Sequence, residues 1–531
     1  MRMKLSRRSV LAFSAAATLA AALSQAGPVL AQDRIDKITW GMGTVPETLF
    51  IPNAWSTGNG IIMSLVQEGP LAFGDDLSVI PGVGSQEFRD STTIVYTLRD
   101  DVTFGDGSPL TPADLVATYE FHRDHANNGS QVGFFFDPIE SIEVTGALEV
   151  TVKLSAPNVQ FQYAAPHMAG FLFKKEQIEG DRTDLGGADQ LILGTGPYRI
   201  AKFDPGERVL LEARDDYWNG VPVVKQIEFV RIPDAEAQLL AMQSGQIDGL
   251  FNIRIASIDQ WESLPNVDIY EAPSASTMLL TLNNDTAPFN DVHVRRAIAY
   301  SVDREGLLNA LLNGKGEVLN AINPPEMWAG VMSADEARSF YRTIPTYGFD
   351  LEKARAELAQ SAVPNGFEFT VPVANNATDA INVLQNLAQN LAEIGVTLTI
   401  EQVDPNQWLT QFFQSGAPMQ LMTYWPDFAD PVNYPDLFMH SRNARENGQN
   451  QSYYRNPVVD ALLETANTEF DPAVRRDALT KVFEIVNDDV AVVPIYTPYS
   501  AMALNNKYQM TGYNSFWYNI PWAVRGFGLK S

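Results

Sequence analysis

The sequence predicts an α/β fold, because two of its stretches alternate strand and helix signals. Residues 227–251 have the pattern of a strand, a helix and a second strand, with Asp234 at the start of the helix and Gly245 at its end. Residues 367–400 repeat this order, and the apolar face of the expected helix consists of Ile381, Leu384, Ala388 and Leu391. Such alternation is typical of a largely parallel sheet covered by helices.

The first 31 residues have the composition of an export signal. Four basic residues precede an Ala-rich apolar stretch over residues 10–23, and residues 29–31 have the small-x-small pattern of a cleavage site. Residues 6–9, Ser-Arg-Arg-Ser, favour the twin-arginine route, and the general secretory route stays open. We therefore expect a soluble, exported protein in the periplasm, with its signal cleaved near Ala31.

Charge and cysteine content exclude several classes of function. The 531 residues include 37 basic and 64 acidic side chains, which give a net charge of −27 at pH 7. Loss of the four basic residues of the signal leaves a net charge of −31, so nucleic acid and anionic membrane surfaces are poor partners. The chain has no cysteine, which excludes disulfides and a thiol nucleophile. Its length suits two or three lobes of roughly 100 to 200 residues each.

Residues 98–115 combine a strand end, a turn and a helix start. Residues 94–98 have the β-branched and aromatic content of a strand, and residues 105–107, Gly-Asp-Gly, supply the turn. Residues 111–114, Thr-Pro-Ala-Asp, form a capping box with proline at the first helical position. We expect a helix to begin at this box.

The other elements follow from apolar periodicity and turn residues. Further strands are expected over residues 37–42, 139–144, 148–154, 226–232, 419–424 and 492–496. Further helices are expected near residues 294–302, 461–466 and 475–488, and a short one around Trp408. For Arg295 and Arg296, on the first of these helices, we expect a structural or solvated role rather than binding of an anion.

Five motifs of the chain resemble the signatures of one protein family. They are Leu-Arg-Asp-x-Val-x-Phe-x-Asp-Gly-x-Pro-Leu-Thr-x-x-Asp-Leu at 98–115, Gly-Thr-Gly-Pro-Tyr at 194–198, Asp-Tyr-Trp at 216–218, Pro-Phe-x-Asp-x-x-Val-Arg-Arg-Ala-Ile at 288–298, and Tyr-Arg-Asn-Pro-Val-Val-Asp at 454–460. In these motifs the chain is similar to the extracytoplasmic solute-binding proteins of bacterial ABC importers, dipeptide and oligopeptide-binding family (family 5). The matches extend from about Pro46 to Tyr496.

The resemblance implies a two-lobe periplasmic binding protein of type II, with an extra small domain inserted in the first lobe and a hinge of two strands. The implied segments are a signal (1–31), a first lobe in three parts (32–60, 193–272 and 491–531), the inserted small domain (61–192) and a second lobe (273–490). The hinge strands are expected near residues 270–274 and 490–496.

The expected ligand site follows the strand over residues 419–424. Ligands of open α/β sheets bind beyond the carboxyl ends of strands, and this strand leads directly into Trp-Pro-Asp-Phe-Ala-Asp-Pro at 425–431. The segment resembles the family's Trp-x-x-Asp-x-x-Asp-Pro motif, whose first aspartate holds the ligand's α-ammonium group, and the resemblance gives this role to Asp427. One residue separates Trp425 from Asp427 where the family has two, so a peptide amine as the target and a simple turn cap both stay open.

Aromatic side chains are candidates for the walls of the site. Tyr424, Trp425 and Phe428 lie beside Asp427 in the sequence, and Trp55 lies in an early segment rich in proline and glycine. Such rings either stack on a ligand or pack in a core, and for Trp55 packing within its lobe is the favoured interpretation.

The sequence contains no recognisable catalytic constellation. Gly-Lys-Gly at 314–316 lacks the spacing of a phosphate-binding loop, and there is no Gly-x-Ser-x-Gly motif. His122 and His125 lie three residues apart on an expected helix, where a solvated face is favoured over a metal site. We expect no enzymatic activity, no metal and no cofactor, and we expect ATP hydrolysis to belong to a partner.

The function implied by the resemblance is capture of a dipeptide, oligopeptide or similar small solute between the lobes. The expected partner is an inner-membrane ABC permease with its ATPase subunits, and the protein is expected to be a monomer. Two alternatives stay open: the same fold with an oligosaccharide, an opine, a nickel chelate or haem as its ligand, and an exported hydrolase.

Overall fold

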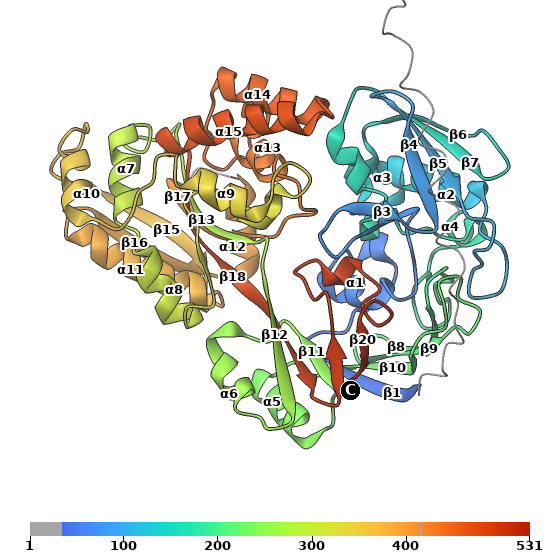
Figure 1. Ribbon diagram of the computed structural model, residues 1–531. Coiled ribbons are helices and arrows are strands. Elements are labelled where there is room, and N and C mark those ends of the chain that lie inside the picture. The colour runs from blue at the N-terminus through green and yellow to red at the C-terminus, as the bar shows by residue number, and fades with distance from the viewer. Residues whose placement is uncertain (1–33, 415–416, 531) are drawn as a thin grey trace, which may run out of the picture.

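The computed structural model describes residues 34–414 and 417–530 (Figure 1). The predicted signal at residues 1–31, with its twin-arginine motif and cleavage site, lies outside these residues. Within the described ranges, no helix is both long enough and apolar enough to cross a membrane.

One mixed sheet runs through the molecule. Its strand order is β17-β13-β18-β11-β1-β10-β9-β8, and β12 and β14 also pair with β18. The bounds are β1 (Ile35–Met42), β8 (Tyr198–Asp204), β9 (Arg208–Ala213), β10 (Val224–Arg231), β11 (Gly249–Phe251), β12 (Val267–Pro273), β13 (Thr277–Leu282), β14 (Gly316–Val318), β17 (Met419–Tyr424) and β18 (Val492–Asn505).

The prediction of a largely parallel sheet is wrong for this long sheet. Only β1 pairs in parallel, with β10 on one side and β11 on the other. The pairs from β8 to β10 and from β11 to β17 are antiparallel. The short turn between β8 and β9 returns the chain directly beside itself, which produces an antiparallel neighbour, whereas a parallel neighbour needs a longer crossover.

Both predicted strand-helix-strand units are present. The helix α5 (Ala235–Ser244) begins where the Asp234 side chain accepts a hydrogen bond from the backbone N–H of Ala237, 2.8 Å away, and ends at Gly245, whose φ of 75° favours glycine. The second unit joins β15 (Glu368–Ala374) and β16 (Thr397–Val403) as a parallel pair through α11 (Thr378–Ala392). Sequence periodicity therefore identified both crossovers.

The strand β18 belongs to both halves of the molecule. Its residues 492–496 pair with β13, and its residues 499–505 pair with β12. We call residues 34–272 with 499–530 the first lobe, and residues 277–496 the second lobe. Figure 1 shows β12 and β18 at the junction of the two bodies. The domain limits named from the sequence stay a prediction.

Smaller sheets complete the first lobe. A four-stranded antiparallel sheet has the order β4-β5-β7-β6, and β2 pairs with β3 and β19 with β20. Their bounds are β2 (Leu71–Phe73), β3 (Val79–Pro81), β4 (Gly84–Phe88), β5 (Thr93–Leu98), β6 (Ile139–Val144), β7 (Glu149–Leu154), β19 (Tyr508–Met510) and β20 (Phe527–Leu529). The predicted capping box is present, because the Asp114 carboxylate accepts a hydrogen bond of 2.8 Å from the backbone N–H of Thr111.

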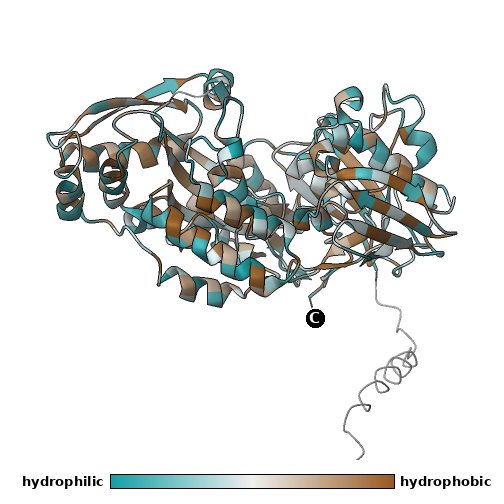
Figure 2. Cartoon of the chain, turned by 90° about the horizontal axis from the view of Figure 1, so that it is seen from above, coloured by the Kyte–Doolittle hydropathy of each residue, from teal (hydrophilic) through white to brown (hydrophobic). Residues whose placement is uncertain are grey.

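Helices cover the sheets of both lobes. The first lobe contains α1 (Thr57–Met63), α2 (Pro112–Arg123), α3 (His125–Asn128), α4 (Lys175–Ile178), α5 and α6 (Ile258–Glu262). The second lobe contains α7 (Val292–Tyr300), α8 (Arg304–Leu312), α9 (Ala334–Tyr341), α10 (Leu351–Leu358), α11, α12 (Pro405–Gln414), α13 (Asn433–Met439), α14 (Pro457–Thr468) and α15 (Pro472–Asp488). Figure 2 shows hydrophobic residues along the strands and helices of both bodies.

Three large apolar clusters form most of the core of the described residues. In the first lobe, Trp40 of β1 packs against Trp522, with ring centroids 4.4 Å apart. A second cluster lies around β13 and α11 of the second lobe and continues into the first lobe, where it includes Leu250 and Trp261, and a third cluster lies around α14 and α15. Arg295 is buried and donates to the carbonyl oxygens of Phe289 and Asp489, which fits the predicted structural role.

The expectation of a solvated face for both histidines of the expected helix is wrong for His122. This side chain is buried, stacks on Phe136 with ring centroids 4.8 Å apart, and lies 2.8 Å from the Ser130 hydroxyl. Burial lowers the pKa of His122 to about 3, so the ring is neutral. His125 lies at the surface, 3.0 Å from Asp137. Among the residues described by the structure, no three His, Asp or Glu side chains are arranged to hold a metal ion.

Candidate ligand-binding site

The two aspartates that follow β17 have opposite surroundings. Asp430 is fully buried, and its carboxylate accepts hydrogen bonds from Nη2 of Arg475 at 2.6 and 2.8 Å and from the Tyr163 hydroxyl at 3.0 Å. The backbone N–H of Val432 donates a further hydrogen bond of 2.9 Å. Each carboxylate oxygen of Asp430 therefore has two donors, and the charge is paired inside the protein.

Asp427 is the unpaired member. Within residues 34–414 and 417–530, its carboxylate has no hydrogen bond and no cationic partner, and the side chain keeps some accessible surface. Burial raises the pKa of Asp427 to about 7, because no neighbouring charge compensates for the lost water. An ammonium group beside this carboxylate would supply the missing partner.

Tyrosines surround Asp427. Its carboxylate lies close enough to the hydroxyls of Tyr424, Tyr434 and Tyr518 to raise their pKa values further, beyond the larger effect of burial. The hydroxyl of Tyr434 already donates to the carbonyl oxygens of Ala275 and Tyr424, at 2.8 and 3.0 Å. Tyr518 belongs to η8 (Trp517–Asn519) of the first lobe, so Asp427 lies where the two lobes meet.

Three adjoining cavities extend from the first lobe past β18 to the end of β17. One of about 300 Å³ lies at the end of β1 and the start of α1, and it shares Asn252 with a second cavity of about 340 Å³. The second shares Arg254, Met278, Asp379 and Thr423 with a third cavity of about 460 Å³ at the start of α11. These volumes lie in the range of small-molecule sites.

One ion pair supplies the charge in these cavities. Arg254, which precedes η5 (Ile255–Ser257), donates through Nη2 to Oδ1 of Asp379 on α11, 3.2 Å away. The described lining residues of the three cavities include no other charged side chain. The pair joins the first lobe to the second, and both side chains are about half exposed. Such a pair contributes little to stability and exchanges partners readily.

A larger cavity of about 700 Å³ lies elsewhere. Its lining includes Asp75, Asp76 and Glu326 with apolar residues such as Met332, and it shares no lining residue with the other three. Trp425 does not line this cavity but lines the middle one of the other three, so we place the candidate ligand site in those three cavities and at Asp427, which lines none of them and lies two residues after Trp425.

The structure separates the predicted aromatic wall into two groups. Trp425 is 50% exposed and lines the middle cavity. Tyr424 is partly buried, and its ring meets those of Tyr434 and Phe438 edge-on. These two rings lie on the side of the second lobe, and only Trp425 faces open space.

Phe428 and Trp55 belong to an aromatic cluster between the lobes. Phe428 is buried and stacks on Tyr163, with centroids 4.7 Å apart and planes 3° from parallel. Phe135 lies 6.2 Å from Phe428 and 6.3 Å from Trp55, so it connects the two rings. Trp55 also packs against Phe134 and lines none of the three cavities. The roles of all five predicted site residues in binding stay predictions.

Sequence analysis did not identify several residues that shape this region. Arg254, Tyr163 and Arg475 lie in segments without a distinctive motif, and their partners are 125, 267 and 45 residues away in the chain. No local periodicity identifies contacts over such separations.

Comparison with known proteins places the chain near one group. The model of the bacterial extracellular solute-binding proteins, family 5, matches residues 80–446. A probable D,D-dipeptide-binding periplasmic protein, DdpA of Escherichia coli K12, is 24% identical over 423 residues, which cover 79% of this chain and 78% of DdpA. The oligopeptide-binding protein OppA of Bacillus subtilis is 24% identical over 430 residues, 77% of each chain.

Solved structures share the fold. HbpA2 of Haemophilus parasuis superposes with a TM-score of 0.81 and 22% identity, over 93% of this chain and 100% of HbpA2. DppA of Helicobacter pylori, in complex with the peptide STSA, gives a TM-score of 0.76 at 20% identity over 94% and 99%. AgaA of A. tumefaciens R10, in complex with agropinic acid, gives 0.75 at 20% over 93% and 99%. At these identities the likeness shows the α/β binding-protein fold alone.

Proposed function

The chain belongs to the bacterial extracellular solute-binding proteins of family 5, the substrate-binding components of ABC importers, and we propose that its ligand is a short peptide or a related small molecule with a primary ammonium group. Members of this family bind their solute and do not transform it. The predicted absence of enzymatic activity is therefore confirmed, and the exported hydrolase is set aside.

The carboxylate of Asp427 carries this proposal. It is largely enclosed by protein, lacks a cationic partner, and has a pKa raised to about 7 by burial. An ionised carboxylate in such a place is unfavourable until a cation arrives. A ligand ammonium would donate hydrogen bonds to it and offset the lost hydration, so binding energy would depend directly on the amine.

Arg254 supports a ligand that also has a carboxylate. A guanidinium carries five N–H donors, and the structure uses one of them, in the bond to Asp379. Arg254 lines two of the three adjoining cavities, those of about 340 and 460 Å³, so a ligand carboxylate placed there would find free donors. An amine at Asp427 and a carboxylate at Arg254 are the two ends of a peptide. An opine also combines an amine with carboxylates, although its amine is secondary, and the native mass spectra described below separate the two classes.

The cellular compartment in which the protein acts follows from the same proposal. We place the mature chain in the periplasm, exported through its N-terminal signal, where it would deliver ligand to an inner-membrane permease with its ATPase subunits. The net negative charge of −27 argues against nucleic acid as a partner. A monomer suffices for this role, because both lobes of the site come from one chain.

Calorimetry with two matched peptides tests the proposal. Mature protein freed of co-purified ligand by unfolding and refolding is titrated with trialanine and with N-acetyl-trialanine. We expect trialanine to bind and the acetylated peptide, which has no ammonium, to bind at least ten-fold more weakly. Equal binding of the two peptides would contradict the role of Asp427. Native mass spectra of protein purified gently from the periplasm would reveal any other ligand class, because a single repeated mass matching an opine, a sugar or a chelate would exclude peptides.

A further inference from the structure

Tyr163 of the first lobe contacts two residues that follow Asp427 in the second. Its hydroxyl donates to Oδ2 of Asp430, 3.0 Å away, and its ring stacks on Phe428 at 4.7 Å. Phe428 directly follows Asp427, and Asp430 comes three residues after it. One side chain of the opposite lobe therefore holds the turn that carries the candidate ligand carboxylate.

The acceptor of this hydrogen bond, the carboxylate of Asp430, is held in place by residues of the second lobe alone. Asp430 and Arg475 form a buried ion pair within the second lobe, and Nε of Arg475 also donates to the carbonyl oxygen of Ala466 at 3.0 Å. Burial and the adjacent carboxylate hold the pKa of Tyr163 far above its usual range, so the hydroxyl stays a donor. Without Tyr163, Oδ2 of Asp430 would lose one of its two donors, and Phe428 would lose its stacking partner.

A second polar contact joins the same surfaces. Nε2 of Gln160, in η3 (Val159–Tyr163) of the first lobe, donates to Oδ1 of Asn467 on α14, 2.6 Å away. Asn467 in turn donates to Asp436 of α13 at 2.7 Å. The residues that carry both contacts on the first lobe thus lie on one short helix.

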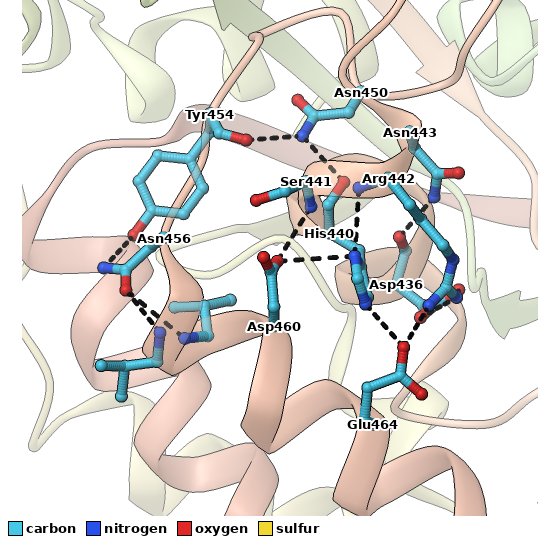
Figure 3. A network of polar contacts seen from close by, with 12 residues as sticks. Asp436, His440, Ser441, Arg442, Asn443, Asn450, Tyr454, Asn456, Asp460 and Glu464 are labelled. Carbon is cyan, nitrogen blue, oxygen red and sulfur yellow. Dashed lines mark hydrogen bonds and ion pairs between the residues drawn. The ribbon is translucent and has the colours of Figure 1, made fainter.

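Ion pairs connect the helices of the second lobe that surround Asn467. Figure 3 shows Asp436 paired with Arg442, and Arg442 and His440 both contacting Glu464 of α14. These pairs tie α13, η7 (Ser441–Asn443) and α14 together. Asn467 lies on the same helix as Glu464, so the first lobe docks on a surface whose geometry is already set.

We infer that Tyr163 and Gln160 form a latch between the lobes and that Tyr163 is a positioning residue for the ligand site, acting through Phe428 and Asp430 on the turn that holds Asp427. This inference rests on the proposed function. When the lobes separate, Tyr163 leaves with the first lobe, and the turn loses both contacts. The ligand and the latch both favour the closed arrangement of the lobes. Formation of the latch therefore raises the affinity for the ligand, and bound ligand favours formation of the latch.

The expected signature of the latch is a change in ligand dissociation. A hydrogen bond to a charged group gives roughly a ten-fold or larger preference for the state that contains it. Since trialanine enters and leaves through the open arrangement, in which the latch is broken, Tyr163→Phe should raise the dissociation rate of trialanine about ten-fold and should not lower its association rate. A merely structural loss would lower thermal stability without separating the two rates.

The matched control is Tyr198→Phe. The Tyr198 hydroxyl is also buried and donates a hydrogen bond of 3.0 Å, but to the carbonyl oxygen of Val224 within the first lobe. The two variants remove the same atom, and only one removes a contact between the lobes. An equal effect of both variants on trialanine dissociation would overturn the inference.

Distances between the lobes test the latch without any ligand. The chain has no cysteine, so Val144→Cys and Glu352→Cys, at exposed positions of β6 and α10, accept two spin labels cleanly. Tyr163→Phe should shift the distance distribution of the full mature chain toward longer values, and Tyr198→Phe should not. Unchanged distances in Tyr163→Phe would overturn the latch, whereas failure of trialanine to bind the unaltered chain would contradict the proposed function alone.

A double-mutant cycle keeps the test available if Tyr163→Phe does not fold. Gln160→Ala, Asn467→Ala and the double variant are compared by the same distances. A coupling between Gln160 and Asn467 supports the latch, because the two residues interact only when the lobes meet. Strict additivity of the two single variants would overturn it.

Discussion

Replacing Asp427 by asparagine should stabilise the ligand-free protein while removing its affinity for an amine. Asparagine has the shape of aspartate and no charge, so Asp427→Asn leaves the turn in place and removes only the ionised carboxylate. Binding sites often retain groups that cost stability for the sake of function. Asp427 shows this directly, because nothing in the described part of the protein pairs with its carboxylate.

The expected gain in the free energy of unfolding follows from the pKa of Asp427. Burial raises the pKa of Asp427 from its usual 3.8 to about 7, and each unit corresponds to about 1.4 kcal/mol. The ionised form therefore lowers the free energy of unfolding by up to about 4 kcal/mol; the remaining solvent contact makes this an upper bound. Because the folded pKa of Asp427 lies above the unfolded one, the contribution of this group to stability is most favourable below pH 4, falls as the pH rises to about 7, and is constant above.

Thermal denaturation of ligand-free protein at pH 4, 6 and 8 measures this effect. With an unfolding entropy of about 2.1 cal/mol/K per residue, a gain of about 4 kcal/mol raises the Tm of a chain of this size by about 4 °C. We expect the Asp427→Asn variant to exceed the unaltered protein by this amount at pH 8 and to match it at pH 4.

The control for this experiment is Asp335→Asn, at a side chain that is 96% exposed. It should show no gain in Tm that grows with pH. If the Tm of Asp427→Asn equals or falls below that of the unaltered protein at pH 8, the reasoning on the unpaired carboxylate is refuted.

Three further predictions concern the cavities and their walls. Affinity for trialanine should rise about ten-fold per pH unit from pH 5 to 7 and then level off, because Asp427 must be ionised to pair with the ammonium; calorimetry in two buffers of different ionisation enthalpy would count the released proton, and a flat profile would contradict the pairing. Arg254→Gln should weaken binding of trialanine roughly ten-fold and leave trialanine amide unaffected in the same assay; equal losses would exclude a carboxylate contact. Phe428→Ala should cost about 3 to 5 kcal/mol of stability because the ring is buried, whereas Trp425→Ala, at an exposed ring, should cost under about 1 kcal/mol and reduce affinity; equal Tm values for the two variants would show that the wall is misassigned.

Local signals in the sequence were enough to identify most elements. Asp234 and Gly245 mark the two ends of α5, and the Thr-Pro-Ala-Asp box at 111–114 marks the start of α2. These signals depend on residues within one or two turns of each other, so they are readable without tertiary structure. The strand at 419–424 and the turn after it were likewise found from composition alone.

Contacts between distant segments could not be predicted in the same way. The sequence indicates that β17 is buried, but not that it lies beside β13 at the end of a mixed sheet. Phe428 looks like a ligand wall when only its neighbours in the chain are considered, whereas its ring is covered by Tyr163, 265 positions earlier in the chain. Apolar periodicity predicts that one face of an element is buried, but it does not identify the segment that packs on that face.

The same limit applies to His122. Its position on an expected helix beside His125 suggested a solvated face, and the structure buries it against Phe136. A histidine kept neutral by burial behaves as an aromatic core residue, which charge patterns along a helix do not reveal.

The long strand β18 determines when the first lobe can complete its folding. Its residues 502–504 pair with β11, and Trp522, which follows β18, packs on Trp40 near the beginning of the described residues. A ribosome releases the chain from its N-terminus, so the core of the first lobe stays incomplete until nearly the last residues have been synthesised. Contacts of such long sequence separation fold slowly. A truncation at residue 490, although it removes only the final 41 residues, would therefore leave the oldest part of the nascent chain without its core rather than shorten a tail.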